Sequence, residues 1–243
     1  MKNLGIDMIL TIFATVNHSK NQIITIMKRF ILTMLLGVMA LGAMAGSGKF
    51  TVQGWFLVEN EDDSVTLQII DCDYQLLYEE TRAASAEMLD LSFDLKDAAL
   101  LIVVDGLEGY QRHHIVPAIP GDTVLFYMEG EPYYGLGGSQ FYIDYDEAVR
   151  AIEPQAIELF EQDAHSDRYL EVLNKYEEAL LAYVKEHPDQ EASVALLAIF
   201  GEDAEVERGD ALLTERVHNS VVANLFKPRL AAAKERRLMM PQF

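Results

Sequence analysis

Residues 89–95, LDLSFDL, decide the fold class of the first half of the chain. Apolar side chains occupy every second position from Leu89 to Leu95, and Asp90, Ser92 and Asp94 occupy the positions between them. A period of two places the two sets on opposite sides of a pleated strand, so this stretch predicts a strand buried on one side only. The same alternation recurs in KFTVQGWF (49–56) and SVTLQII (64–70).

Four more segments, 74–80, 99–104, 111–119 and 123–129, have strand character and are separated by turn residues. The clearest turn is Pro120-Gly121-Asp122, a combination that favours tight chain reversal. Seven or eight short strands at this spacing predict an antiparallel β-sandwich or partly open barrel over residues 49–135.

From about residue 138 the apolar period becomes helical. Five side chains recur at steps of three and four: Tyr169, Leu173, Tyr176, Leu180 and Tyr183. Ser166 precedes this stripe as the expected N-cap, and Pro188 follows its end. Further helices are expected over 190–200 and within 211–239, with Pro228 in the first turn of the last one. The expected fold class is therefore α+β, with an all-helical region over residues 140–240.

The last expected helix is basic. It carries Lys227, Arg229, Lys234, Arg236 and Arg237. Cations complement the negative end of a helix dipole, and they also suit docking against the acidic remainder of the chain.

An internal segment, MKRFILTMLLGVMALGAMA (27–45), has the three parts of a secretory signal. Lys28 and Arg29 precede 16 uncharged residues, and Ala43 and Ala45 form an A-x-A site before Gly46. The uncharged run is shorter than the roughly 20 residues of a membrane-spanning helix. We expect cleavage before Gly46 and interpret residues 1–26 as a misassigned upstream extension. The alternatives are a core helix or an uncleaved anchor.

Composition excludes several classes of function. Residues 1–45 contain four basic and one acidic side chain, so residues 46–243 keep 15 basic and 38 acidic ones, a net charge of −23. Phosphate backbones repel such a surface, so nucleic acid is not an expected partner, and stable membrane insertion after cleavage is not expected either. Cys72 is the only cysteine. It cannot form an internal disulfide, although an intermolecular one stays open.

The sequence contains no recognisable catalytic or metal-binding constellation. His113 and His114 are neighbours on an expected strand and should point to opposite faces, which disfavours joint ligation of a metal. GLGGS (135–139) lacks the spacing of a phosphate loop, so we interpret it as a turn from sheet to helix with Ser139 as a cap. DYDEA (144–148) reads as an acidic first helical turn. We expect neither a cofactor nor a metal, and no enzymatic activity.

One aromatic group is denser than the rest of the chain. Its members are Tyr133, Tyr134, Phe141, Tyr142 and Tyr145. They fall where the sheet gives way to helices, so we expect them to pack between the two regions or to form a surface for a partner.

Several segments together resemble one family. These are KFTVQGWF (49–56), IPGDTVLFYME (119–129), YYGLGGSQFYIDYDEA (133–148), VKEHPDQEASVALL (184–197) and LLTERVHNSVVANLFKPRL (212–230). Their order resembles the N-terminal half of exported thiol–disulfide oxidoreductases of Gram-negative bacteria. In that family a signal, a β-sandwich domain of unknown function and a helical region precede a thioredoxin-like domain with a catalytic C-x-x-C. That domain would begin just after Met240-Pro241, so the resemblance implies a fold and a compartment and no catalytic residue.

The leading hypothesis is an exported, non-catalytic binding or accessory protein of the cell envelope, periplasmic or secreted. Its expected partner is another envelope protein, with a thioredoxin-like protein and a second copy of the chain as candidates. The alternative is a subunit or truncated form of a thiol–disulfide oxidoreductase that works with a separate thioredoxin-like protein. A third hypothesis is a hydrolase or metal-dependent enzyme whose site is assembled from distant residues.

Overall fold

The computed structural model describes residues 48–56, 64–83, 88–107, 110–130, 133–166 and 168–239. The expected upstream extension, the signal and its cleavage residues Ala43, Ala45 and Gly46 lie outside these residues. Within them the fold is α+β: strands come first in the chain and helices follow.

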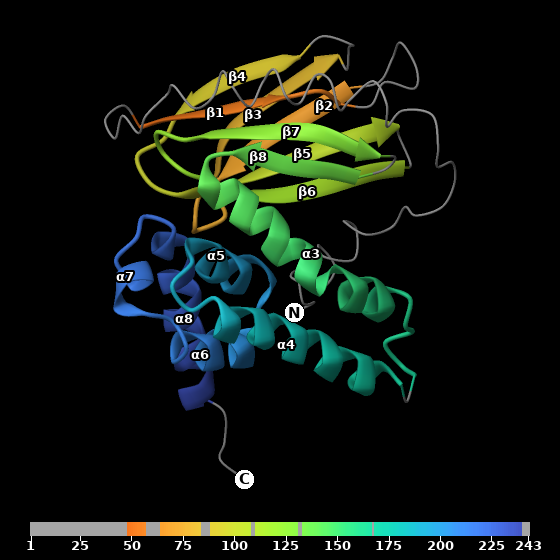
Figure 1. Cartoon of the computed structure of the whole chain (residues 1–243), viewed down its shortest axis with the longest axis vertical. Coiled ribbons are helices and arrows are strands. Elements are labelled where there is room, and N and C mark those ends of the chain that lie inside the picture. The colour runs from red at the N-terminus through yellow and green to blue at the C-terminus, as the bar shows by residue number, and fades with distance from the viewer. Residues whose placement is uncertain are drawn as a thin grey trace.

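Eight strands form two four-stranded sheets. They are β1 (Lys49–Gly54), β2 (Ser64–Ile70), β3 (Leu76–Ala83), β4 (Leu89–Asp94), β5 (Ala99–Leu107), β6 (Tyr110–Ala118), β7 (Thr123–Gly130) and β8 (Tyr133–Gly138). One sheet has the order β4-β1-β7-β8 and the other β3-β2-β5-β6. Paired strands are antiparallel apart from β1 and β7, which run parallel. The sheets lie over one another as a sandwich and do not close into a barrel (Figure 1).

The alternating side chains that predicted the strands form the core of the sandwich. Val65, Leu67 and Ile69 of β2 are buried, as are Phe50 and Val52 of β1, while the residues between them are partly exposed. Burial of one side of each sheet against the other is what a period of two requires.

Strand β8 is the main difference from the sequence prediction. GLGG was interpreted as a turn into the helical region, but it continues the sheet, pairing with β7 from Tyr133 to Gly138. The physical reason lies on β7, where the ring of Tyr127 lies across β8. A Cβ on Gly135 would come within 2.5 Å of that ring. Gly135 therefore leaves room for an aromatic ring, whereas Gly138 has a φ of +110°, which other residues rarely adopt, and β8 still pairs as a strand.

Six helices follow the strands. They are α3 (Gln140–Phe160), α4 (Tyr169–Glu186), α5 (Glu191–Phe200), α6 (Asp203–Asp210), α7 (Glu215–His218) and α8 (Ala223–Met239). Every residue of α5 from Ala192 to Phe200 is buried, because α5 lies at the centre of the helical region and is apolar on all sides. Among the helices of the described residues, none combines the length and the apolar character needed to cross a bilayer.

Two details of the helix prediction are wrong. Ser166 does not cap α4 with its side chain; its hydroxyl oxygen is buried without a partner among the described residues, and only its carbonyl accepts from the N–H of Tyr169. Pro228 lies inside α8 rather than in its first turn, because α8 begins at Ala223. The helix starts earlier since Val222, Leu225 and Phe226 are buried in the core.

The basic side chains of α8 pair with acidic groups of α6. Arg236 donates two hydrogen bonds to the carboxylate of Asp203, at 2.5 and 2.6 Å, and Lys234 contacts Asp210 at 3.2 Å. Arg237 pairs with Glu207. One of the two interpretations of this basic charge was that the helix docks against acidic residues. The ion pairs between α8 and α6 agree with that interpretation.

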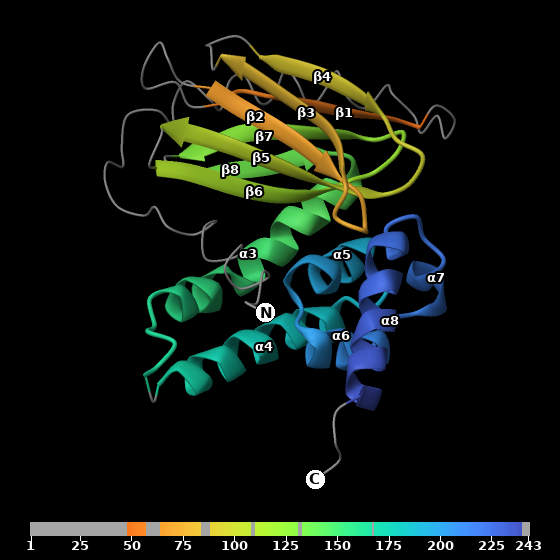
Figure 2. The same cartoon turned by 180° about the vertical axis from the view of Figure 1, so that it is seen from behind.

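The sandwich and the helices also meet on the side opposite α3. There Asn224, at the start of α8, donates to the carboxylate of Asp97 at 2.8 Å, and the β2–β3 turn extends toward the same helix (Figure 2). On the open side of the sandwich, Tyr78 of β3 contacts the ring of Phe93 on β4 and donates to the carbonyl of Asp94 at 2.8 Å.

Candidate functional site

The junction between the sandwich and the helical region is the part of the structure that best qualifies as a site. Helix α3 leaves β8 and passes along the side of the sandwich where β6 and β8 form the outer strands of their sheets (Figure 1). Outer strands present backbone groups that no neighbouring strand pairs. The first turns of α3 carry the side chains that satisfy some of these groups.

Tyr142 and Tyr145 bind the outer edge of β6. The hydroxyl of Tyr142 donates to the carbonyl of Pro117 at 3.0 Å, and that of Tyr145 to the carbonyl of Ile115 at 3.0 Å. The spacing is geometric: residues three apart share a face of a helix, and residues two apart point the same way along a strand. Burial raises the pKa of both hydroxyls well above the ordinary value. They are permanent donors, unsuited to general acid–base chemistry.

Asp146 binds β8, the outer strand of the other sheet. Its carboxylate accepts from the N–H of Leu136 on β8 at 3.2 Å and pairs with Arg150 at 2.8 Å. The DYDEA segment therefore lies in the second turn of α3, since the helix begins at Gln140, and the interpretation as a first turn is corrected.

Ser139 stands at the N-cap position of α3 but does not cap it with its side chain. Its hydroxyl donates instead to Asp122 at 2.7 Å, which ties the start of α3 to the turn before β7. The sequence predicted that Ser139 stands at the start of a helix. It did not predict the hydrogen bond with Asp122, because Asp122 lies 17 residues earlier in the chain.

The five aromatic residues do not form one cluster. Phe141 lies with Tyr142 and Tyr145, its ring centroid 5.0 and 6.1 Å from theirs. Tyr134 instead contacts Phe56, Phe126 and His114 inside the sandwich, with centroids 5.0–6.3 Å away. The side chain of Tyr133 lies outside the described part of the structure.

The outer face of the junction centres on His187, the residue that follows α4. Its ring lies 4.4 Å from that of Tyr183, tilted by 31°. The Tyr183 hydroxyl donates to the carbonyl of Asp144 at 3.3 Å and contacts the side-chain oxygen of Gln190 at 3.0 Å. These contacts join α3, α4 and the start of α5. Burial, then the charges of Glu147 and Asp144, raises the pKa of Tyr183.

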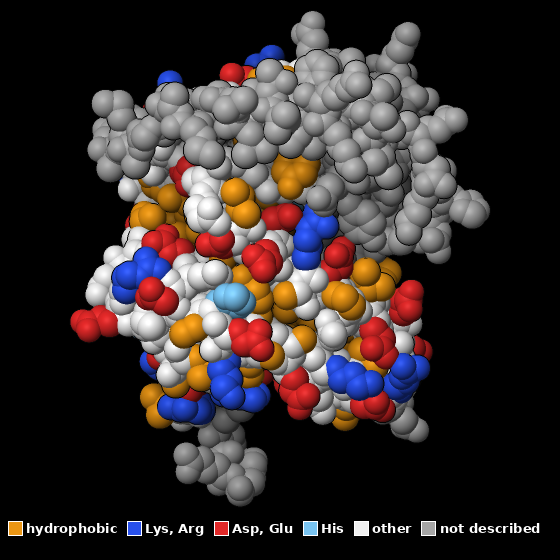
Figure 3. Space-filling view, viewed as in Figure 1, with side chains coloured by type: hydrophobic (Ala, Val, Ile, Leu, Met, Phe, Trp, Pro, Cys, Tyr) orange, Lys and Arg blue, Asp and Glu red, His pale blue; other side chains and the backbone are white. Residues whose placement is uncertain are grey.

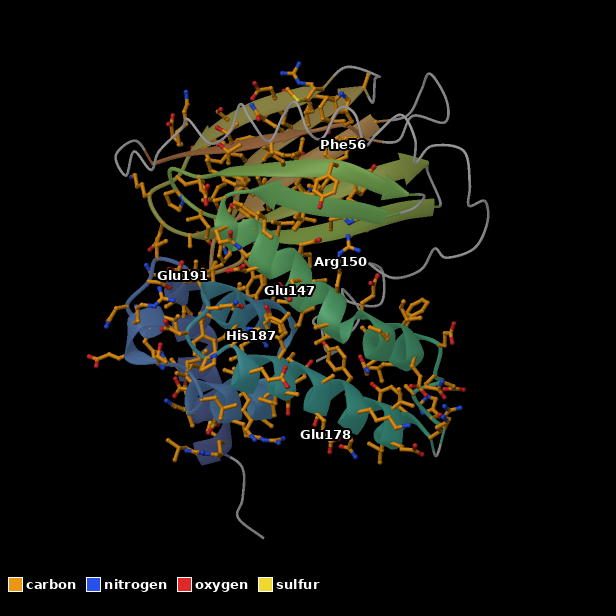
Figure 4. The ribbon with its side chains drawn as sticks, viewed as in Figure 1. Phe56, Glu147, Arg150, Glu178, His187 and Glu191 are labelled. Carbon is orange, nitrogen blue, oxygen red and sulfur yellow. The ribbon has the colours of Figure 1, made fainter. Side chains whose placement is uncertain are left out.

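Acidic side chains gather around this histidine. Figure 4 labels His187 between Glu147 and Glu191, and Figure 3 shows red carboxylates on this face of the molecule around a pale-blue histidine. Burial, with a contribution from Asp122, raises the pKa of Glu191, while Arg216 opposes the rise. Ile143, one helical turn before Glu147 on α3, is 48% exposed. We call Ile143, Glu147, Tyr183, His187 and Glu191 the His187 face.

The sequence prediction missed the His187 face. His187 belongs to no recognisable motif, although its spacing of four from Tyr183 was a signal that the two rings meet at the end of a helix. The contribution of Gln190 and Asp144 could not be predicted, because it depends on how α3 crosses α4.

His113, His114 and Cys72 belong to the sandwich and lie apart from the His187 face. His113 and His114 are half-buried on β6, and the ring of His114 turns inward to Tyr134. The described residues include no group of three His, Cys, Asp or Glu side chains placed to hold a metal ion. Cys72 is half-buried in the β2–β3 turn. Burial first, then Asp73 and Asp71, raises the pKa of its thiol, which disfavours the reactive thiolate.

Comparison with the models of known protein families and with curated proteins gave no match to this chain.

Proposed function

We propose that this chain is an exported, non-catalytic binding protein of the cell envelope and that it binds a partner through the His187 face. The observation that carries the proposal is the fixed arrangement of the side chains on that face. Tyr183 fixes the ring of His187 and joins three helices through two contacts, while Ile143 and Glu147 beside it stay exposed. A preorganised polar face with one exposed apolar side chain suits protein recognition.

The expected partner carries basic side chains. The face presents Glu147 and Glu191, and the chain as a whole has a formal net charge of −20. Complementary charge accelerates association and makes it sensitive to salt. The resemblance to exported thiol–disulfide oxidoreductases supports an envelope partner, with a thioredoxin-like protein as the leading candidate.

A photo-crosslinking experiment tests the binding role. The full chain, expressed with its own N-terminus in a Gram-negative host, carries a photoreactive amino acid at Ile143 or, as a control, at Leu170. Leu170 is 66% exposed at the start of α4. We expect one discrete adduct from position 143 that Glu147→Lys weakens. Identical adducts from both positions would show that the face is not selective.

Export and the absence of catalysis need separate tests. N-terminal sequencing of the protein from the periplasmic fraction should give Gly46 as the first residue; a chain that keeps residues 30–45 would contradict export by a cleaved signal. Turnover of a disulfide substrate by the isolated chain, abolished by Cys72→Ser, would replace the proposal with a redox enzyme.

A further inference from the structure

Residues 74–78, YQLLY, carry a contiguous group of exposed apolar side chains. Tyr74, Leu76 and Leu77 are 58%, 55% and 45% exposed, and Tyr78 is 38% exposed. Single exposed apolar residues are ordinary, but contiguous ones mark an interaction surface. The stretch spans the end of the β2–β3 turn and the start of β3, on the side of the sandwich opposite α3 (Figure 2). It therefore lies apart from the His187 face.

The backbone of this stretch departs from regular geometry in two places. Tyr74 has a φ of 61°, in the left-handed region that favours glycine. The pairing of β2 with β3 then shifts between Ile69 and Ile70, and Leu77 has no paired residue on β2 within the described strands. Such a bulge changes the direction of side chains at a sheet edge. A regular strand would alternate Leu76 and Leu77 between its two sides, whereas here both are exposed.

Both ends of the stretch are held in place. The carboxylate of Asp71 accepts hydrogen bonds from the backbone N–H groups of Asp73 and Gln75, at 2.9 and 2.8 Å, which closes the turn. At the other end the ring of Tyr78 packs on that of Phe93, with centroids 5.5 Å apart. The apolar side chains between these ends are presented on a fixed backbone, so a partner would pay little ordering entropy to bind them.

Carboxylates flank the stretch on both sides. Asp71 and Asp73 precede it, and Glu79 and Glu80 follow it. Arg82 is the cation on the same strand, and it pairs with Glu80 at 2.7 Å. An apolar centre with an acidic rim is complementary to an apolar hollow with a basic rim.

These charges indicate which occupant the stretch suits. Arg236 of α8 lies within electrostatic reach of Tyr74, but it donates two hydrogen bonds to Asp203 and is already engaged. Two copies of the chain that met through this stretch would bring their acidic rims together, and like charges across an interface disfavour binding. A partner with basic side chains meets no such repulsion.

We propose that Tyr74, Leu76 and Leu77 form a docking surface for a partner protein that presents an apolar hollow rimmed by lysine and arginine side chains. Tyr74 is the expected anchor, because a tyrosine contributes a large rigid ring and a hydroxyl to an interface. This surface goes beyond the proposed function and does not depend on the His187 face.

A pair of synthetic peptides tests the proposal with the full chain. Both have a Phe-Leu-Leu centre, which lysines flank in one peptide and glutamates in the other. We expect wild type to bind the lysine peptide and not the glutamate peptide, and Leu76→Ser and Leu77→Ser to weaken binding by about tenfold or more. Cys72, two residues before Tyr74, locates the peptide: binding should slow its reaction with a thiol reagent. Leu170→Ser, a change at an equally exposed leucine on α4, is the matched control and should bind as wild type does.

Four results would overturn the proposal. If wild type does not bind the lysine peptide, the surface does not suit a basic partner. If Leu170→Ser weakens binding as much as Leu76→Ser does, the acidic chain attracts basic peptides without a defined surface. If Glu147→Lys weakens binding and Leu76→Ser does not, the peptide lies on the His187 face. A concentration-dependent dimer that Leu76→Ser abolishes would make a second copy the occupant.

Tyr74→Gly separates recognition from folding. Glycine adopts a positive φ without strain, so this variant should unfold at the same or a higher urea concentration than wild type. It should nevertheless bind the lysine peptide about tenfold more weakly, because the ring is gone. A variant that loses stability and keeps its affinity would show that the ring of Tyr74 supports the turn and does not bind a partner.

Discussion

The two tyrosine hydroxyls that bind β6 give the most specific stability prediction. In Tyr142→Phe and Tyr145→Phe the ring stays in place and only the hydroxyl is removed, so the carbonyl of Pro117 or Ile115 becomes a buried acceptor without its donor. Leaving a buried polar group unpaired costs about 1–3 kcal/mol, so each variant should lose that much free energy of unfolding. In a chain of this size the loss corresponds to a fall in melting temperature of about 2–4 °C per kcal/mol.

Urea unfolding with two probes measures this effect. Trp55 is the single tryptophan and directly follows β1, so its fluorescence reports on the sandwich, while far-ultraviolet circular dichroism reports mainly on the helices. We expect both transitions to shift together with an unchanged denaturant dependence.

Tyr74→Phe is the control for these two variants, because Tyr74 is 58% exposed. The double variant measures the coupling between the two bonds. If both single variants lose less than about 0.5 kcal/mol of free energy of unfolding, these hydroxyls do not stabilise the junction between the sandwich and the helices. Separate transitions for the two probes would show that the sandwich and the helices unfold independently.

Three further perturbations test other parts of the fold. Gly54→Ala should destabilise the chain by about 1–3 kcal/mol, because the new Cβ would lie 2.7 Å from the Cβ and carbonyl oxygen of Phe126. Thermal unfolding measures this loss. An unchanged melting temperature would mean that the backbone of β7 can shift to make room for the Cβ. Arg229→Met should lower the free energy of unfolding by about 1.5–3 kcal/mol, because it removes two charge-assisted hydrogen bonds to buried carbonyls. Chemical unfolding measures this loss. An unchanged stability would mean that water replaces the guanidinium as the donor to these carbonyls. Cys72 should react with a disulfide reagent more slowly than a free thiol at neutral pH. Asp73→Asn should accelerate this reaction, because the Asp73 carboxylate helps to raise the pKa of the Cys72 thiol. Equal reaction rates in wild type and variant would contradict the contribution of Asp73.

Most strands of the fold could be predicted because each carries a signal in its own residues. Alternation in β2 and β4 depends only on which side of a sheet each residue faces, and the Pro120-Gly121-Asp122 turn is encoded locally. Strand β8 could not be recognised in the same way. The reason for Gly135 is the ring of Tyr127 on the neighbouring strand β7, and glycines by themselves are typical of turns.

The candidate site was predictable only in part for the same reason. The junction aromatics Tyr142 and Tyr145 stood out by density and position, but their acceptors lie on β6, 25 and 30 residues earlier in the chain. Tyr134 had the same signal and lies inside the sandwich, because alternation along β8 turns it inward. Contacts across distant elements, such as that of Asn224 with Asp97, leave no periodic trace in a sequence.

The position of α3 has a consequence for how this sandwich could be inherited or engineered. An uncovered sheet edge can recruit a strand from another chain and lead to aggregation. Tyr78 bridges β3 to β4, and Glu80 shares the inner face of the sheet with buried Leu67, so that side discourages a foreign strand without help from the helices. The β6 and β8 side is covered by α3, which binds β6 through Tyr142 and Tyr145 and β8 through Asp146. A fragment cut between β8 and α3 would expose it, so α3 belongs to the sandwich as its closing element, and a transplanted sandwich must carry this helix with it.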